Sequence, residues 1–470
     1  MILKIQFLLQ IQNIIVYASP QSLVTKDTGP SVFLEFLLGN PHLLSMIVID
    51  KIHLLTDFGR SFRTEFQMLK DKLFQKVKET KPMLFLTVTC TTSIITSFEN
   101  LIGVTCNNIR WPSPLEMVNW KVLIEVLYTP LWFLSVQKTI KSYVSHHATL
   151  PNKVIIYSNS RKRILLLIEK LENYFDGDDD LQACDVLTLV GTQTRAQKAT
   201  TTNVFINGSD ELEYNLDVLC ATSGVGNAGI DCREVRAVYR VDFPPSISDI
   251  SQERGRAGRR DDATPYDYMY QVAISLELFL HLYKRINHPE SRTKDSVHRE
   301  YQMQELMDVA SLFASSVQCY YIAIEKKLGN PQGEDQSTAD NCAGHCPNCL
   351  GKKLFPKVCK SGLKTILFDI FISGPNQITD RRTPQCVWDC IRKYPNSGPL
   401  IFRSCESRNL PPLGTIKKVM FQLITSRIIQ IQFDMEQNDI VLSLASPGER
   451  STEMAMNSID SFWDDMKLLI

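Results

Sequence analysis

The chain has 470 residues, of which 44% are hydrophobic and 22% are charged, as is ordinary for folded globular proteins, and this length predicts about three domains. Its 51 lysines and arginines balance its 51 aspartates and glutamates, so no long-range positive field attracts nucleic acid and any such binding depends on local patches. Thirteen cysteines in so long a chain exclude a small secreted disulfide framework, and because four of them cluster they favour a metal site in a reducing compartment.

The first 18 residues, MILKIQFLLQIQNIIVYA, form an apolar run that Lys4 and several amide side chains interrupt. The interruption favours a buried strand over Ile14–Tyr17 that runs into a turn at Ser19-Pro20, and the alternative is a signal peptide. No uninterrupted apolar stretch reaches the roughly 18 residues of a membrane helix, so the sequence predicts no membrane association.

Short β-branched segments alternate with helical patterns up to about residue 285, which is typical of parallel sheets covered on both faces. The predicted helices include Phe62–Lys78 and Ser160–Phe175, and a polar break at Ser145–Asn152 predicts two α/β units joined by a linker. The predicted strands are Met46–Ile49, Leu84–Val88, Val154–Tyr157, Val186–Val190, Val218–Ala221 and Val235–Tyr239.

The period becomes helical again over Arg299–Leu328, and a smaller unit follows at about residues 356–445. Three helices followed by a hairpin are typical of a winged helix, in which cationic residues of the third helix can meet phosphates. The alternative is a protein-interaction or packing module. The predicted elements are helices at Leu363–Ile372, Pro384–Tyr394 and Thr415–Ser426 and strands at Ile428–Phe433 and Ile440–Leu444.

Four cysteines, Cys319, Cys342, Cys346 and Cys349, have the spacing C-x22-C-x3-C-x2-C. Four thiolates suit a closed tetrahedral Zn²⁺ site, and the tight spacing of the last three lets one loop supply three ligands. We expect the first cysteine to lie late in an amphipathic helix that anchors this loop. The alternatives are that His345 replaces one thiol or that the cysteines are buried apolar residues.

Met46–His53 reads MIVIDKIH, an apolar strand that ends in Asp50. In nucleotide-driven motors a carboxylate at the end of a buried strand holds Mg²⁺. The next residues, HLLTDFGRSFRTEF, carry Phe58, Phe62 and Arg63, which suit stacking on bases and contact with a phosphate. The alternative is a core stripe of phenylalanines at helical spacing.

Two glycine-containing segments follow, ATSGVGNAGID at Ala221–Asp231 and SQERGRAGRR at Ser251–Arg260. The glycines of the first allow the backbone to approach DNA or nucleotide closely. In the second, Arg256 and Arg259 present guanidinium forks that match phosphate oxygens and that stabilise charge at a γ-phosphate in the transition state. The alternative is a basic helix start that makes surface ion pairs.

Together with LFLTVT (Leu84–Thr89) and VIIYSNSR (Val154–Arg161), these motifs resemble those of RecQ-type DNA helicases over most of residues 14–445. The resemblance implies an α/β fold with tandem RecA-like motor domains, the first incomplete, followed by a zinc-binding subdomain and a winged helix. The implied domains are residues 1–148, a partial first motor domain, 149–295, a second motor domain, 296–355, the zinc subdomain, 356–446, the winged helix, and 447–470, a polar tail.

The resemblance also implies roles for single residues. The implied catalytic residues are Asp50, His53, Gln252, Arg256 and Arg259. The implied nucleotide-binding residues are Asp50, Gly229, Asp231, Arg256 and Arg259. The implied DNA-binding residues are Phe58, Phe62, Arg63, Ser158, Thr222, Lys417 and Lys418, and the implied zinc ligands are the four cysteines.

Several positions depart from the family pattern. Lys51 stands where the family has the glutamate that orients the attacking water, and Phe58 stands where it usually has tryptophan. The Ala221–Asp231 motif has one extra residue, and the close cysteines are C-x3-C-x2-C rather than C-x2-C-x2-C. No segment reads G-x-x-x-x-G-K-[ST], the loop that cradles phosphates, and the resemblance begins about midway through the first motor domain.

By resemblance the chain is an ATP-dependent 3′ to 5′ DNA helicase that unwinds duplexes in replication, recombination or repair. ATP, Mg²⁺ and a structural Zn²⁺ are its implied cofactors. Its implied partners are single-stranded DNA, duplex junctions and proteins that bind the winged helix. The implied location is the nucleus of a eukaryotic cell or the cytoplasm and nucleoid of a bacterium. The alternative is a truncated, inactive helicase remnant that only binds DNA or protein.

Overall fold

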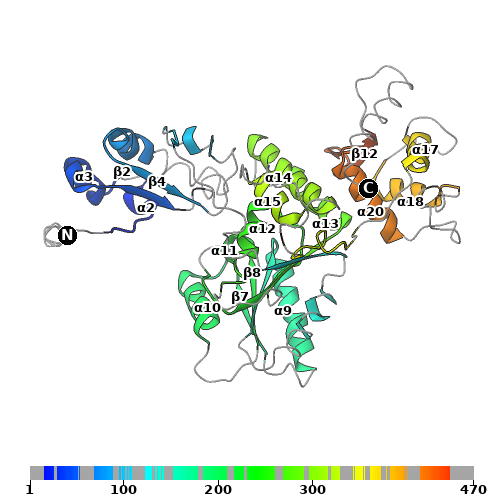
Figure 1. The fold of residues 1–470 in the computed structure, drawn as a ribbon, viewed down its shortest axis with the longest axis horizontal. Helices are drawn as coiled ribbons and strands as arrows, with labels where there is room; N and C mark the ends of the chain where they lie inside the picture. The colour runs from blue at the N-terminus through cyan, green and yellow to red at the C-terminus, as the bar shows by residue number, and fades with distance from the viewer. Residues whose placement is uncertain are drawn as a thin grey trace, which may run out of the picture. The chain divides into compact units, whose positions relative to one another are not determined.

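The structure is a computed structural model of the whole chain, and it divides into two compact units, Met1–Arg110 and Trp111–Ile470 (Figure 1). It describes residues 15–25, 29–50, 52, 68–87, 122–129, 152–177, 184–208, 216–226, 230–259, 268–289, 296–315, 319–328, 342, 344–352, 354, 360–371, 377, 382–395, 397, 400 and 413–444, with short pieces between 95 and 107 and between 133 and 141.

The first unit holds two parallel strands, β3 (Ile47–Asp50) and β4 (Met83–Leu86), which confirm two of the predicted strands. Its other elements are α2 (Pro20–Leu23), β1 (Val24–Thr25), β2 (Gly29–Pro30), α3 (Val32–Gly39), η1 (Pro41–Leu43), the π-helix η2 (Lys70–Phe74) and α6 (Gln75–Val77). A small core of side chains such as Leu34, Leu73 and Phe74 joins them.

The buried strand predicted at Ile14–Tyr17 is wrong. Residues 15–17 are not in a strand, and Ile15 and Tyr17 are 80% and 92% exposed. The β-branched composition is present, but a strand needs a neighbouring strand to satisfy its backbone groups, and no described strand pairs with this segment. The predicted turn at Ser19-Pro20 is instead the start of α2, where the Ser19 side chain accepts a hydrogen bond from the backbone of Ser22.

The second unit contains a six-stranded parallel sheet in the order β5-β10-β9-β6-β8-β7. Its strands are β5 (Leu123–Tyr128), β6 (Asn152–Ser158), β7 (Cys184–Leu189), β8 (Leu216–Thr222), β9 (Val235–Arg240) and β10 (Met269–Ile274). Four of these confirm predicted strands, and helices α9 (Arg161–Asp176), α10 (Arg195–Asn207), the short α11 (Ser223–Gly226) and α12 (Ile247–Arg254) lie between them (Figure 1).

Both faces of this sheet are buried, which explains its near-continuous apolar strands. In β6, Val154 and Ile156 belong to one core with α9, whereas Ile155 and Tyr157 belong to a second core with residues of α10 and α12. The alternation follows from the period of two of a strand. The sheet and helices of the second unit therefore form a helix–sheet–helix sandwich, as the strand–helix alternation predicts.

The edge strand β5 was not predicted, and it lies upstream of the expected domain boundary at residue 148. It pairs in parallel with β10 along its whole length, so residues 122–129 belong to the sheet of the second unit. Both strands carry a polar residue in mid-strand, and the Gln271 side-chain amide donates to the Glu125 carboxylate across the pair at 2.6 Å. Because these polar residues interrupt the apolar pattern, the sequence does not predict either strand.

The C-terminal elements agree with the predicted ones, except that the helix at Leu276–Asn287 was not predicted and the helical pattern at Arg299–Leu328 forms two helices. They are α13 (Leu276–Asn287), α14 (Ser296–Ala314), α15 (Tyr320–Lys327), α17 (Lys360–Phe371), α18 (Pro384–Lys393), α20 (Leu413–Thr425), and the antiparallel hairpin of β11 (Ile429–Asp434) and β12 (Asp439–Leu444). The Phe421 ring of α20 lies 5.7 Å from the Phe279 ring of α13 and 6.1 Å from that of Phe243, so the C-terminal helices share one core with the sheet. No described helix is long and apolar enough to cross a membrane.

Candidate nucleotide and metal sites

The arginine segment, residues 254–259, begins at the last residue of α12. This helix begins at Ser246, whose hydroxyl accepts a hydrogen bond from the Asp249 backbone at 3.0 Å, and it ends at Arg254. Gly258 has a φ of +71°, and a Cβ at this position would lie 2.9 Å from a Val122 methyl group of the chain leading into β5. Only glycine therefore fits this turn, which fixes where the following arginine emerges.

Arg256 and Arg259 converge on the end of the ATSGVGNAGID motif, as the resemblance implies. The Arg256 Nη1 donates to the Ile230 carbonyl at 2.7 Å, and the Arg259 Nη1 lies 2.5 Å from the Asp231 carboxylate, which is 80% exposed. Burial lowers the pKa of Arg256, and the nearby Tyr157 hydroxyl opposes this effect. Three predicted nucleotide-binding residues from two motifs thus form one partly exposed cluster.

A buried polar network lies beneath this cluster, and the sequence did not reveal it. The Arg240 Nη1 lies 2.5 Å from Glu253 Oε1 and its Nε lies 2.8 Å from Asp242 Oδ1, and the Arg240 and Glu253 side chains are fully buried. Burial alone lowers the pKa of Arg240, but the two carboxylates raise it above its ordinary value. Because Glu253 is on α12 and Arg240 ends β9, this ion pair anchors the helix that carries the arginines.

Ser158 belongs to this network rather than to an exposed surface. Its side chain is buried and donates to Asp242 Oδ2 at 2.7 Å, so it faces the interior instead of a DNA backbone. Thr222 ends β8 and is half-buried, and Gln252 on α12 donates from its Nε2 to the Ser248 hydroxyl at 3.2 Å. A signal for the network was present, because Arg240 and Asp242 are charged residues at and just after the carboxyl end of a strand, where parallel sheets gather functional groups.

The first unit carries the predicted residues Asp50, His53, Phe58, Phe62 and Arg63. Asp50 ends β3 at the carboxyl end of the strand and is exposed, as a Mg²⁺ ligand requires. His53, Phe58, Phe62, Arg63 and, in the second unit, Gly229 lie outside the described residues. Their predicted roles therefore stay predictions.

An ionisable side chain of α14 lies at the start of α12 in an unusual environment. The Glu305 carboxylate of α14 accepts a hydrogen bond from the backbone N–H of Ile247, and burial, together with the nearby Asp308, raises the pKa of Glu305 to about 7. Because the folded state binds this proton more tightly than the unfolded state, its contribution to stability is present below about pH 4.5 and is lost as the pH rises through about 7.

We expect the substitution Glu305→Gln to remove this pH dependence. The free energy of unfolding of the wild type, relative to the variant, should fall by about 3 kcal/mol between pH 5 and pH 8, since one pKa unit corresponds to about 1.4 kcal/mol. Urea titrations at both pH values measure the difference. Parallel pH profiles for the two proteins would contradict the assignment.

The cysteines predicted to bind zinc form one cluster. The Sγ atoms of Cys319, Cys342, Cys346 and Cys349 all lie within 4.8 Å of one another. The Cys342–Cys346 and Cys346–Cys319 Sγ separations are 3.6 and 3.9 Å, close to the ~3.8 Å edge of a ZnS₄ tetrahedron with 2.3 Å bonds. The four residues therefore fit a zinc ion, which would join the start of α15 to the loop at 342–349.

One detail of the cluster differs from expectation. Cys319 does not lie late in a helix but is the N-cap residue of α15, because the helical pattern is divided into α14 and α15. The cluster does not include His345, whose Nδ1 contacts the Cys342 carbonyl. The backbone carbonyl of His345 accepts a hydrogen bond from Ile124 of β5 at 2.8 Å, so the metal loop is attached to the edge of the sheet.

Lys417 and Lys418, predicted to bind DNA, have partners within the chain. The Lys417 ammonium forms an ion pair with Glu277 of α13 and lies 4.7 Å from the Trp388 ring centre. The Lys418 ammonium donates to the Leu354 carbonyl at 2.9 Å, and burial lowers its pKa. These contacts give both lysines a packing role between α20 and its neighbours.

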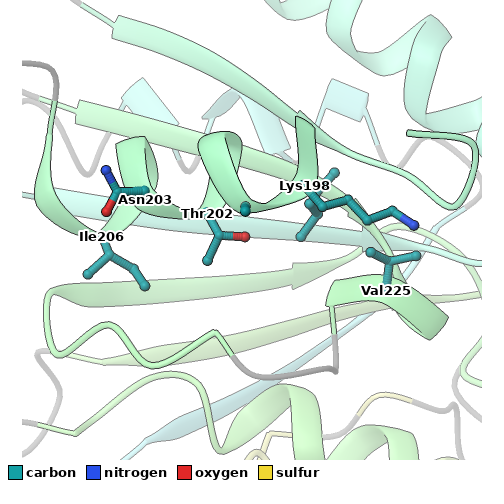
Figure 2. Close-up of a pocket in the computed structure, with 7 residues that line it drawn as sticks. Lys198, Thr202, Asn203, Ile206 and Val225 are labelled. Carbon is teal, nitrogen blue, oxygen red and sulfur yellow. The ribbon is translucent and has the colours of Figure 1, made fainter. Parts of the chain in front are cut away.

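A cavity of about 590 Å³ lies between α10 and α11 (Figure 2). Apolar side chains such as Leu189, Ile206 and Val225 line it, with Lys198 and Thr202 at its polar part. The Lys198 ammonium donates to the Gly191 carbonyl at 3.1 Å. No predicted catalytic or nucleotide-binding residue lines this cavity.

Comparison with known proteins agrees with this site. Residues 136–261 match the helicase conserved C-terminal domain, a range that contains the arginine segment. The RecQ-like DNA helicase blm-1 of Caenorhabditis elegans is 25% identical over 259 residues, which are 52% of this chain and 22% of that protein. The ATP-dependent DNA helicase RecQ of Haemophilus influenzae is 23% identical over 330 residues, 70% of this chain and 46% of the relative.

Solved structures of helicases are similar to this chain at a lower sequence identity. The Saccharomyces cerevisiae protein Dbp5, solved with RNA and ADP BeF3, is 14% identical with a TM-score of 0.38, over 63% of this chain and 61% of that chain. The chain spans between about a fifth and a half of the two curated relatives above. The chain is therefore similar to the helicase C-terminal domain over residues 136–261 and, at 23–26% identity, to several relatives named as RecQ-type helicases.

Proposed function

We propose that this chain acts in an ATP-dependent DNA helicase of RecQ type that moves 3′ to 5′ along single-stranded DNA. The observation that carries the proposal is the convergence of Arg256 and Arg259 on Ile230 and Asp231, at a partly exposed position that α12 and the Arg240–Glu253 ion pair hold rigid. Two guanidinium groups in fixed geometry are suited to bind phosphate oxygens.

In the proposed site of the second unit the two arginines bind the γ-phosphate of ATP, and the exposed carboxylate of Asp231 keeps the Arg259 fork oriented until the phosphate arrives. Gly229 allows close approach of the backbone to the nucleotide. For the first unit, the resemblance makes the Asp50 carboxylate a proposed Mg²⁺ ligand. His53 and Gln252 complete the proposed catalytic set.

The proposed DNA contacts are the aromatic segment with Phe58, Phe62 and Arg63 and, in the second unit, Thr222. Bases stack on aromatic faces without sequence preference, which suits a motor that must pass any sequence. Because Ser158, Lys417 and Lys418 have partners inside the chain, we do not include them in the proposed DNA surface.

The cysteine cluster is the proposed structural zinc site, and the three C-terminal helices with their hairpin are the proposed winged helix. Both are proposed to contact duplex junctions or protein partners rather than to take part in hydrolysis. In a eukaryotic cell the proposed location is the nucleus, where the DNA substrate lies.

ATP hydrolysis by the purified chain, with and without single-stranded DNA, tests the proposal. We expect DNA-stimulated turnover, and we expect Arg259→Ala to reduce kcat by about 10³-fold or more because an arginine at the γ-phosphate is worth 10³ to 10⁵ in phosphoryl transfer. Arg195→Ala, at an exposed arginine that begins α10, serves as the control.

Lys51 gives the experiment a second arm, since an ammonium stands where the family has the water-orienting glutamate. If the Lys51→Glu variant hydrolyses ATP faster than the wild type, the chain is an ATPase whose turnover Lys51 lowers. No turnover in either protein, with binding of single-stranded DNA intact, would replace the proposal with a DNA-binding module that lacks motor activity.

A further inference from the structure

Arg254, the last residue of α12, is buried with few partners. It is 3% exposed, and its Nε and Nη1 have no hydrogen-bond partner among the described residues. Its guanidinium carbon lies 4.5 Å from the ring centre of Tyr321 in α15. A buried charge without a counter-charge is costly, and a desolvated cation–π contact returns only about 2 kcal/mol, so this arginine needs a further source of stabilisation.

Tyr321 joins this arginine to the cysteine cluster. It lies two residues after the ligand Cys319 in the first turn of α15, and its hydroxyl donates to the carbonyl of Val122. Val122 is the residue against which Gly258 is packed. The Tyr321 ring therefore contacts Arg254 at the start of the arginine segment, and its hydroxyl binds Val122, the neighbour of Gly258 near the end of that segment.

A second link runs through the metal loop, because the His345 carbonyl accepts a hydrogen bond from Ile124, two residues after Val122. With zinc bound, four thiolates outweigh the two positive charges of the ion, which leaves a net negative centre next to α15. Arg254 forms no ion pair with a described residue, and a negative centre two residues from Tyr321 offsets part of its charge. The same ion fixes the positions of Cys319 and of the 342–349 loop.

We propose that Arg254 and Tyr321 are positioning residues through which metal binding at the cysteine cluster orders the arginine segment. The cluster and the segment are far apart in sequence, and these two side chains give them a direct connection. The inference rests on the proposed zinc site. It adds that the metal controls the geometry of Arg256 and Arg259 as well as the stability of its own subdomain.

Hydrogen exchange of the full chain, with zinc and after chelation, tests this. The amides of Gly255, Arg256 and Ala257 are hydrogen-bonded to carbonyls of α12 and so report opening of the segment, while the amides of α9 serve as an internal reference. In the wild type we expect chelation to accelerate exchange at residues 255–257 at least ~10-fold relative to α9, together with exchange at the metal loop.

The Arg254→Met variant keeps the volume of the side chain and removes the charge. We expect it to bind zinc and to keep the metal loop protected, but to exchange rapidly at residues 255–257 whether or not zinc is present. Arg382→Met removes a similar contact, of Arg382 with the Phe371 ring at 5.5 Å, and should leave the zinc response unchanged. If Arg254→Met does not fold, Arg254→Lys takes its place, and its smaller, non-planar cation should still weaken the response.

Two failures are distinguishable. A chain that binds no zinc, by metal analysis of the same samples, would refute the proposed metal site itself. Zinc that protects the 344–352 loop without slowing exchange at residues 255–257 would leave the metal site intact and overturn the coupling.

Discussion

The substitution Glu253→Ala is expected to destabilise the second unit by about 3–5 kcal/mol. It leaves the Arg240 guanidinium, which is fully buried, without the carboxylate 2.5 Å away, and removing one partner of a buried ion pair costs this much because the other charge stays buried. Tyr270, whose hydroxyl lies 3.3 Å from the same carboxylate, also loses its partner. Denaturant unfolding followed by circular dichroism measures the loss.

Glu169→Ala is the matched control, because Glu169 lies exposed on α9 and a surface substitution typically changes stability by no more than about 0.5 kcal/mol. A loss below about 1 kcal/mol for Glu253→Ala would mean that water or another cation–carboxylate arrangement compensates Arg240, contrary to the geometry. Asp242, the other partner of Arg240, remains in the variant and still compensates part of its charge. We therefore expect a loss of stability near the lower end of the range, about 3 kcal/mol.

The second large effect concerns the cysteine cluster. We expect purified protein to carry about one zinc per chain and Cys346→Ser to lose it, because Cys346 is fully buried between two other ligands and a hydroxyl is a poor zinc ligand. Structural zinc sites contribute about 10–16 kcal/mol of binding free energy in small domains, so the elements around the cluster should lose cooperative unfolding.

Cys386→Ser provides the control for this experiment, since Cys386 is a half-buried cysteine on α18 that the cluster does not include. It should keep both the metal and the unfolding transition. Metal analysis and thermal unfolding with and without a chelator are the measurements. A wild-type protein that is folded and metal-free, or a Cys346→Ser variant with full zinc content, would contradict the site.

The elements that the sequence predicted well are those with a strong periodic signal. Strands β6 to β9 are short segments rich in buried apolar residues, and α9 has its buried side chains at helical spacing, so each pattern predicted a single type of element. The arginine cluster was also predictable. Both of its motifs contain glycines, which allow the backbone to approach a ligand or another segment closely.

The features that were missed depend on contacts between distant residues. Glu125 and Gln271 look like loop residues until the two strands are side by side, where each satisfies the other. Lys417 and Ser158 look available for phosphate binding in the sequence, but Glu277 and Asp242 hold them, and neither partner is near in the chain. Polar side chains can be assigned to a surface or to an internal network only when their neighbours are known.

The position of β5 bears on how this protein can be divided for experiments. A fragment that starts at the apparent linker near residue 148 would lack β5 and would leave the whole edge of β10 with unpaired backbone groups. Such an edge recruits strands from other molecules, so that fragment should associate and precipitate. It would also lack Val122 and Ile124, the attachment points of Tyr321 and the metal loop. A soluble C-terminal fragment should therefore begin before Val122.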